Sequence, residues 1–219
     1  MRKIILTSLL FFSIASKASA LPISWPDNGH YYDLITFSSA PLSWQEALTD
    51  AESLTYLGVN GHLATITSAG ENAFLNTTFN GGQDSQFAWL GGYEPNDDGV
   101  WKWATGPEAG IQFANGVTPT SPFNYANWGG IEPNDRQSME DFLMFNIGKS
   151  FRGIDPGEWA DAQPNSSGDD PVVAYFVEYE TSHTVPEPST MLLLSFGLLG
   201  AIRFKKVTHF VERVREINS

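Results

Sequence analysis

The chain has 219 residues, no Cys and a formal charge of −13 at pH 7, so no disulfide can hold its fold together. Residues 21–185 contain 22 Asp and Glu against 4 Lys and Arg, a formal charge of −18. Because Lys and Arg neutralise phosphate backbones, this balance argues against nucleic acid as a partner. Many acids with few bases suit divalent cations, although most of the acids are expected to be solvated surface.

Residues 1–20 have the pattern of a secretory signal peptide. Arg2 and Lys3 precede an apolar run at 4–14, and residues 18–20 (ASA) fit a small-residue cleavage site. The alternative is a buried N-terminal helix. We expect export, followed by removal of this segment.

The first half of the exported part predicts two strands and two helices. The strands are expected at residues 30–37 and 62–66. Each helix begins at a capping box, in which a Ser and the Glu three residues later satisfy each other's backbone N–H groups. The two boxes are Ser43 with Glu46 and Ser68 with Glu71. Apolar spacing carries the first helix to Gly58 and the second to about Thr78.

From residue 86 the chain is rich in strands and loops. The expected strands are 87–90, 100–104, 141–145 and 172–179. A loop of roughly 105–139, rich in Gly, Pro and Asn, separates the second strand from the third. Loops longer than about 12–15 residues are uncommon in compact domains and are usually functional or disordered. We expect an ordered binding loop anchored by Phe123 and Trp128.

Oxygen-bearing side chains follow this loop. Glu132 and Asn134 lie on one side of an extended segment, and Glu140 comes eight residues after Glu132. Asp161 arrives from a later strand, directly after Trp159-Ala160. Ca²⁺ takes about 6–8 oxygens from carboxylates, amide carbonyls and water. The sequence therefore predicts a calcium site whose ion a hydrated polyol can share.

Four short motifs resemble hallmark segments of the C-type lectin domain family. GHLATI (61–66), WLGG (89–92), WKW (101–103) and YANW (125–128) occur in the family's order, within residues 29–180. The resemblance implies an α+β, C-type lectin-like fold with two helices, small antiparallel sheets and a long ligand-binding loop. Trp89, Trp101, Trp103 and Trp128 are expected in the core rather than as sugar-stacking platforms.

The resemblance also implies roles for the oxygen cluster. Glu132, Asn134, Glu140 and Asp161 would bind calcium and hydrogen-bond two vicinal sugar hydroxyls, with the carboxylates accepting and the Asn amide donating. Pro133 is cis in the family, and the Glu-Pro-Asn order resembles the mannose-type preference. The family's Asn before Asp161 is replaced by Ala160, which removes one ligand. The alternatives are a calcium-bound structural loop and a metal-free loop.

A second Glu-Pro-Asn tripeptide, residues 94–96, precedes the WKW motif and is the poorer match to the sugar site. By resemblance it implies an auxiliary calcium site. The expected ligands are Glu94, Asp98, Asp135, Glu140 and Asp141. Crowded carboxylates repel one another unless a cation neutralises them. The alternative is a solvent-exposed acidic turn around Asp97-Asp98-Gly99.

The C-terminus resembles the PEP-CTERM sorting signal of exopolysaccharide-producing bacteria. A Pro-rich linker (181–190) precedes an apolar and basic tail (191–206), and residues 207–219 form an extension. The apolar run is short for a membrane span of about 20 residues. The resemblance implies transient membrane insertion, removal of the tail by an exosortase, and delivery to the cell surface or beyond.

The sequence offers little support for an enzyme. The four His are scattered with no H-E-x-x-H pair, and no G-x-S-x-G or phosphate-binding loop occurs. We therefore expect a non-enzymatic, calcium-dependent protein that binds carbohydrate, with extracellular polysaccharide as its partner. The alternative is a matrix or adhesion protein of the same fold that binds protein or is structural, without sugar recognition.

Overall fold

The computed structural model describes residues 21–37, 41–81, 86–166 and 171–180. The chain divides into two units, residues 1–180 and 181–219, and the described residues all belong to the first. The predicted signal peptide, linker, sorting tail and extension lie outside the described residues.

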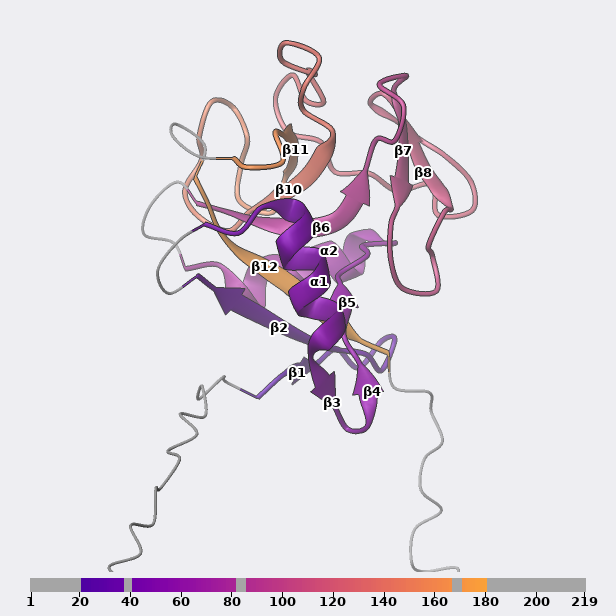
Figure 1. The fold of residues 1–219 in the computed structure, drawn as a ribbon, viewed down its shortest axis with the longest axis vertical. Helices are drawn as coiled ribbons and strands as arrows, with labels where there is room; N and C mark the ends of the chain where they lie inside the picture. Colours follow the sequence, from indigo (N-terminus) through magenta and orange to yellow (C-terminus); the bar gives the residue numbers. More distant parts are fainter. Residues whose placement is uncertain (1–20, 38–40, 82–85, 167–170, 181–219) are drawn as a thin grey trace, which may run out of the picture. The chain divides into compact units, whose positions relative to one another are not determined.

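Two helices and twelve strands make up the described part of the first unit (Figure 1). The helices are α1 (Trp44–Ser53) and α2 (Ala69–Phe79). The strands are β1 (Ile23–Ser24), β2 (Tyr31–Thr36), β3 (Thr55–Tyr56), β4 (Val59–Asn60), β5 (His62–Leu63), β6 (Phe87–Tyr93), β7 (Val100–Trp103), β8 (Gln112–Asn115), β9 (Thr118–Pro119), β10 (Phe142–Asn146), β11 (Trp159–Ala162) and β12 (Val172–Tyr179). The expected α+β composition is confirmed.

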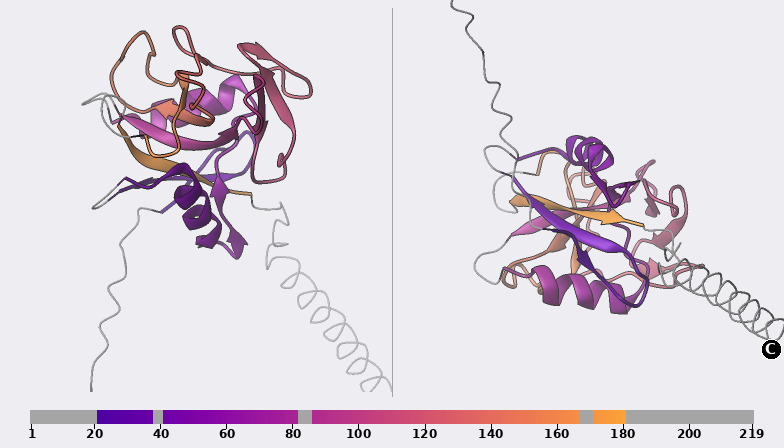
Figure 2. Two further views of the ribbon diagram at one scale, coloured as in Figure 1. Left: turned by 45° about the horizontal axis from the view of Figure 1, so that its top comes forward. Right: turned by 90° about the horizontal axis from the view of Figure 1, so that it is seen from below.

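Ten of these strands form one sheet, where several small sheets were expected. Its order is β1-β2-β12-β6-β7-β8-β9, with β10 paired to β6 and β11, and β5 paired to β12. The pairs are antiparallel except β12 with β6, which run parallel. The two helices lie on opposite sides of the sheet (Figure 2). Each helix packs into its own apolar cluster, α1 through Trp44, Ala47 and Ala51, and α2 through Leu75.

Helix α1 begins as predicted. The Ser43 side chain accepts the Glu46 N–H, and the Glu46 carboxylate accepts the Ser43 N–H at 2.8 Å. Its predicted end at Gly58 is wrong, because Leu54 is already extended. Gly58 instead serves the turn between β3 and β4, where its φ of 84° suits a residue without a Cβ.

Helix α2 confirms one half of its predicted capping box. Ser68 accepts the Glu71 N–H, but the Glu71 carboxylate does not return to Ser68. It accepts the Thr67 N–H at 2.8 Å and the Tyr32 hydroxyl at 2.6 Å. Glu71 is buried, so the contact with strand β2 directs its side chain into the protein.

The core is built from aromatic rings, as expected. Trp89, Trp101 and Trp103 are fully buried, and Trp128 packs against the same cluster as Trp101. Trp103 stacks on Phe113 with ring centroids 4.3 Å apart. These contacts hold the sheet without disulfides.

The expected loop 105–139 is ordered, but it is not free of secondary structure. Strand β8 pairs with β7 and then with β9, which extends the sheet into the loop. Phe123 and Trp128 pack against the core and anchor the remainder, as predicted. The single-sequence pattern missed β8 and β9 because both are short, and each is fixed by pairing with a neighbouring strand and not by a pattern of its own.

Candidate functional site

The predicted oxygen cluster lies where the long loop meets strand β11. Trp159 donates its N–H to Asn127 O at 2.8 Å, and Gly129 donates its N–H to Trp159 O at 2.9 Å. These two bonds hold the loop alongside the start of β11. Asp161, two residues further along this strand, is therefore brought to Glu132 and Asn134.

Asp161 fixes the loop backbone. Its Oδ1 accepts the Asn134 N–H at 3.1 Å, and its Oδ2 accepts the Asp135 N–H at 2.6 Å. Asp161 is only 2% exposed. The peptide bond between Glu132 and Pro133 is cis, as the resemblance implied. The loop segment 132–135 therefore lies against Asp161, the carboxylate predicted to bind the same calcium ion.

Glu132 and Asn134 are in direct contact. The Asn134 side-chain amide donates to Glu132 Oε2 at 2.5 Å. Burial raises the pKa of Glu132 to about 8, helped by a hydrogen bond to Asp161 and by the charges of Asp161 and Glu140, while the Asn134 amide opposes the shift. Of the four predicted ligands, Glu132 contacts Asn134 and Asp161, and Glu140 lies close enough for its charge to raise the pKa of Glu132.

Glu140 lies at the edge of this cluster. Its Oε2 accepts the Arg136 N–H at 3.1 Å, so its carboxylate closes a turn of the loop. Three carboxylates with one amide make a donor set of the kind that calcium prefers. A cation would offset the repulsion that raises the pKa of Glu132. The donor types fit a calcium ion, but among the described residues the carboxylate oxygens of Glu132, Glu140 and Asp161 do not all lie within 4.8 Å of one another.

The predicted auxiliary ligands are brought together only in part. Burial, with the charges of Asp135 and Asp141 adding to it, raises the pKa of Glu94, and burial and nearby acids likewise raise that of Asp141. Asp135 Oδ1 is buried and accepts no hydrogen bond. Asp98 turns to the Val100 N–H of its own turn, at 3.1 Å.

Asp97 belongs to this second cluster, although the sequence reasoning placed it only in an acidic turn. The charge of Asp135, more than any other cause, raises the pKa of Asp97. Asp97 and Asp98 are exposed, as the acidic-turn interpretation expected. The sequence signal that could have identified Asp97 is the adjacent pair Asp97-Asp98, because neighbouring side chains in a turn can point toward different partners.

A third cluster was not predicted. Ligand atoms of His30, Glu178 and Glu180 lie within 4.8 Å of one another. Sequence reasoning dismissed the His residues as scattered, since 148 residues separate His30 from Glu178. The usable signal was the alternation of Glu178 and Glu180, which places both side chains on one face of a strand.

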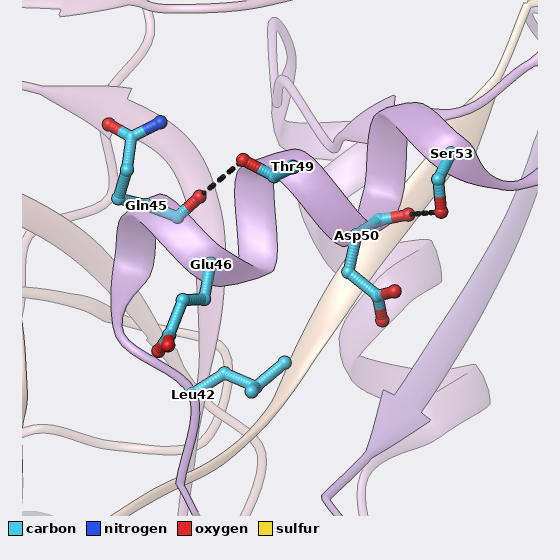
Figure 3. Close-up of a pocket in the computed structure, with 6 residues that line it drawn as sticks. All are labelled: Leu42, Gln45, Glu46, Thr49, Asp50 and Ser53. Carbon is cyan, nitrogen blue, oxygen red and sulfur yellow. Dashed lines mark hydrogen bonds between the residues drawn. The ribbon is translucent and has the colours of Figure 1, made fainter.

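The outer side of α1 carries a shallow hollow lined by Leu42, Gln45, Glu46, Thr49, Asp50 and Ser53 (Figure 3). Its hydroxyl groups are engaged within the helix. Thr49 Oγ1 donates to Gln45 O at 2.9 Å, and Ser53 Oγ donates to Asp50 O at 2.7 Å. These polar groups serve the helix backbone, and the hollow does not resemble a binding site.

Comparisons with known proteins agree with the geometry. The sequence profile of the Lectin C-type domain matches residues 41–168, more than half of the chain. The PEP-CTERM protein-sorting motif matches residues 184–206. Among the described residues, none of the helices has the length and apolar character to cross a membrane.

Two relatives in sequence and one solved structure are similar to this chain. Halomucin of Haloquadratum walsbyi is 37% identical over 153 residues, which cover 69% of this chain and 1% of that protein. E-selectin of Sus scrofa is 33% identical over 100 residues, 46% of this chain and 17% of that protein. The structure of the C-type lectin CEL-I from Cucumaria echinata superposes with a TM-score of 0.50 at 21% identity, covering 73% of this chain and 96% of CEL-I.

Proposed function

This chain belongs to the C-type lectin domain family and carries a PEP-CTERM sorting motif, and on that premise we propose that it is an exported, calcium-dependent carbohydrate-binding protein. Membership of the family supports a carbohydrate-binding, lectin-like protein. The convergence of Glu132, Asn134 and Asp161 on one point carries the proposal, because these residues come from two separate segments. Calcium, when bound, would supply coordination positions for sugar hydroxyl oxygens.

Each side chain has a role in this proposal. Glu132, Asn134, Glu140 and Asp161 hold the cation through their side-chain oxygens. The three carboxylates also accept hydrogen bonds from sugar hydroxyls, whereas the Asn134 amide donates to a hydroxyl oxygen. In the free protein that amide donates to Glu132, so the donor is already directed into the cluster. Glu94, Asp98, Asp135, Glu140 and Asp141, joined by Asp97, would hold an auxiliary calcium ion, with Asp135 Oδ1 offering a buried oxygen that accepts no hydrogen bond.

We propose vicinal hydroxyls of mannose-type sugars in extracellular polysaccharide as the ligand. This specificity rests on the Glu-Pro-Asn order at residues 132–134. The sorting motif suggests export and surface sorting. We further propose that residues 1–20 are removed on export, that residues 191–206 enter the membrane transiently, and that an exosortase removes the tail. None of the proposed roles is catalytic.

One observation favours a second candidate. Ala160 is fully buried in strand β11, beside Asp161, and offers no side-chain oxygen to a ligand. A site lacking that oxygen could hold calcium as a structural ion without reading a sugar. The chain would then be a matrix or adhesion protein with a lectin-like fold.

Calorimetry of the full chain separates the two candidates. Mannose-type glycans are titrated at millimolar calcium and again after chelation, with galactose-type glycans as the control sugar. The proposal expects binding of the mannose-type glycans only with calcium. Binding that persists in chelator contradicts the calcium mechanism. An absence of glycan binding at millimolar calcium favours the matrix protein.

A further inference from the structure

The cluster of His and Glu at the end of β12 follows from strand register. β12 lies between β2 and β5, and Glu178 is paired with Tyr32 on one side and with His62 on the other. Continuing the register of β2 by one residue places Glu180 opposite His30. Because directly opposed side chains share a face of the sheet, all these side chains are directed to the same side.

Short distances connect this set. His30 Nδ1 lies 2.6 Å from Glu178 Oε1, and His62 Nε2 lies 3.5 Å from Glu180 Oε1. Glu178 is nearly inaccessible, whereas the side chains of His30 and Glu180 are 26% and 22% exposed. An ion could therefore enter from the side of His30 and Glu180 and reach the buried carboxylate of Glu178.

His62 lies beside this set. Its Nδ1 faces Leu63 O at 2.9 Å, and its Nε2 is paired with Glu180 Oε1 across 3.5 Å. Burial alone would lower the pKa of His62, but the contact with Glu180 and the charge of Glu178 outweigh burial and raise it. His62 therefore holds Glu180 in place at the edge of the cluster.

We propose that His30, Glu178 and Glu180 form a binding site for a divalent transition-metal ion such as zinc, with a water molecule as the fourth ligand. Imidazole nitrogen with carboxylate oxygen is a donor set that zinc accepts, whereas calcium takes oxygen ligands. The metal replaces the proton that His30 Nδ1 shares with Glu178 Oε1, since metal ligands must be deprotonated.

The surrounding charge favours a cation. Glu71 and Glu108 lie beside Glu178, and Glu108 also lies beside Glu180. Four carboxylates therefore surround two imidazole rings. Glu178 has further partners, because Oε2 accepts the Thr65 N–H at 3.0 Å and Oε1 lies 2.9 Å from the Tyr32 hydroxyl, whose single proton it shares with Glu71. A metal-free hydrogen-bond network is the competing interpretation.

A metal here would tie together strands that are distant in the sequence. His30 directly precedes β2, His62 begins β5, and Glu180 directly follows β12. Residues 181–190 of the predicted linker begin at the next position. The ion would therefore fasten the end of β12 to the start of β2. This role is independent of sugar binding.

The test uses the full chain, stripped with chelator and then saturated with calcium so that the acidic loop is occupied. Zinc is titrated by calorimetry, and cobalt(II) is titrated by visible absorption as a reporter of coordination. We expect saturable binding of about one zinc ion per chain, with intense cobalt bands typical of four ligands. An absence of saturable zinc binding overturns the proposal.

Two variants locate the site. His30→Gln and Glu180→Gln should each weaken zinc binding by more than the ~10–100-fold that a change outside the ligand shell can cost. Glu52→Gln, an exposed acid of α1, and His183→Gln should leave zinc binding unchanged. Circular dichroism checks folding, and Glu180→Gln decides the question if His30→Gln misfolds. Unchanged affinity in both site variants, or a loss in His183→Gln instead, contradicts the proposed site.

Discussion

The side-chain amide of Asn134 donates a hydrogen bond to Glu132 Oε2 at 2.5 Å. The two residues flank Pro133, so donor and acceptor project from one short segment of the loop. This contact lowers the pKa of Glu132, against burial and the nearby acids that raise it. Asn134 therefore serves the free protein by partly stabilising a crowded carboxylate, and the same amide is the donor proposed for the sugar.

Asn134→Asp should weaken sugar binding by about tenfold or more while calcium binding is retained. The change replaces the only proposed amide donor by an acceptor, and leaving the buried sugar hydroxyl oxygen without a donor costs about 1–3 kcal/mol. Calorimetry with mannose-type glycan and with calcium separates the two effects. Asn96→Asp, in the exposed second Glu-Pro-Asn tripeptide, is the matched control and should retain sugar binding. Equal losses in the two variants would contradict the assignment of residues 132–134.

Asp161→Asn should lower calcium affinity by roughly tenfold or more. The Asp161 carboxylate accepts two backbone N–H groups from the loop, and an Asn side chain offers only one acceptor oxygen. The variant therefore loses both a charge and a loop contact. Calcium titration monitored by Trp fluorescence measures the effect, and Asp155→Asn, on an exposed loop, is the control. A calcium affinity equal to that of the unmodified chain would exclude Asp161 as a ligand.

Stability of the metal-free protein should fall as the pH rises from 4.5 to about 8. The pKa of Glu132 is raised from an ordinary value of 4.5 to about 8, mainly by burial. A carboxyl group with a raised pKa binds its proton more tightly in the folded chain, so its contribution is complete below pH 4.5 and is lost above 8. Thermal melts in chelator at several pH values test this sign.

Saturating calcium should reverse that dependence, because the ionised form of Glu132 is the one that binds a cation. Glu132→Gln, which cannot ionise, should make the melting temperature in chelator less dependent on pH over the same range. A melting temperature that rises with pH in chelator would contradict this prediction, because it would show that the surroundings of Glu132 do not favour its protonated form.

Ala160→Asn should destabilise the domain without improving sugar binding. Ala160 is fully buried in an apolar cluster with Met144 and Trp44, and an amide there would lack partners. An unsatisfied buried polar group costs about 1–3 kcal/mol, and in a domain of this size each kcal/mol lowers Tm by about 2–4 °C. Ala160→Leu, of similar size and without polar atoms, separates polarity from crowding. A gain in calcium-dependent sugar affinity would show instead that position 160 can face the ligand.

Local signals in the sequence identified much of the fold. The cap of α1 at Ser43 and strand β12 at 172–179 were predicted at the positions observed. Each depends on residues adjacent in the chain: a hydroxyl before an apolar periodicity for the cap, and a run that is apolar except for Glu178 for the strand. The segment 132–134 was likewise recognisable, because its three residues are contiguous.

Other features depended on contacts with residues elsewhere in the chain, which no local sequence pattern identifies. The direction of the Glu71 side chain was decided by Tyr32, and the strand β8 by its pairing with β7. The end of α1 was decided by the hairpin that follows it.

By itself, then, the sequence determined the family, the capped helices, the long strands and the acids that could bind calcium. Only the tertiary structure decided which acids meet and that Ala160 is buried beside them. It also decided that Glu178 lies between His62 and Tyr32. The physical reason is that an apolar periodicity or a helix cap depends on residues that are close together in the sequence. Strand register, in contrast, joins residues more than a hundred positions apart and chooses their common face.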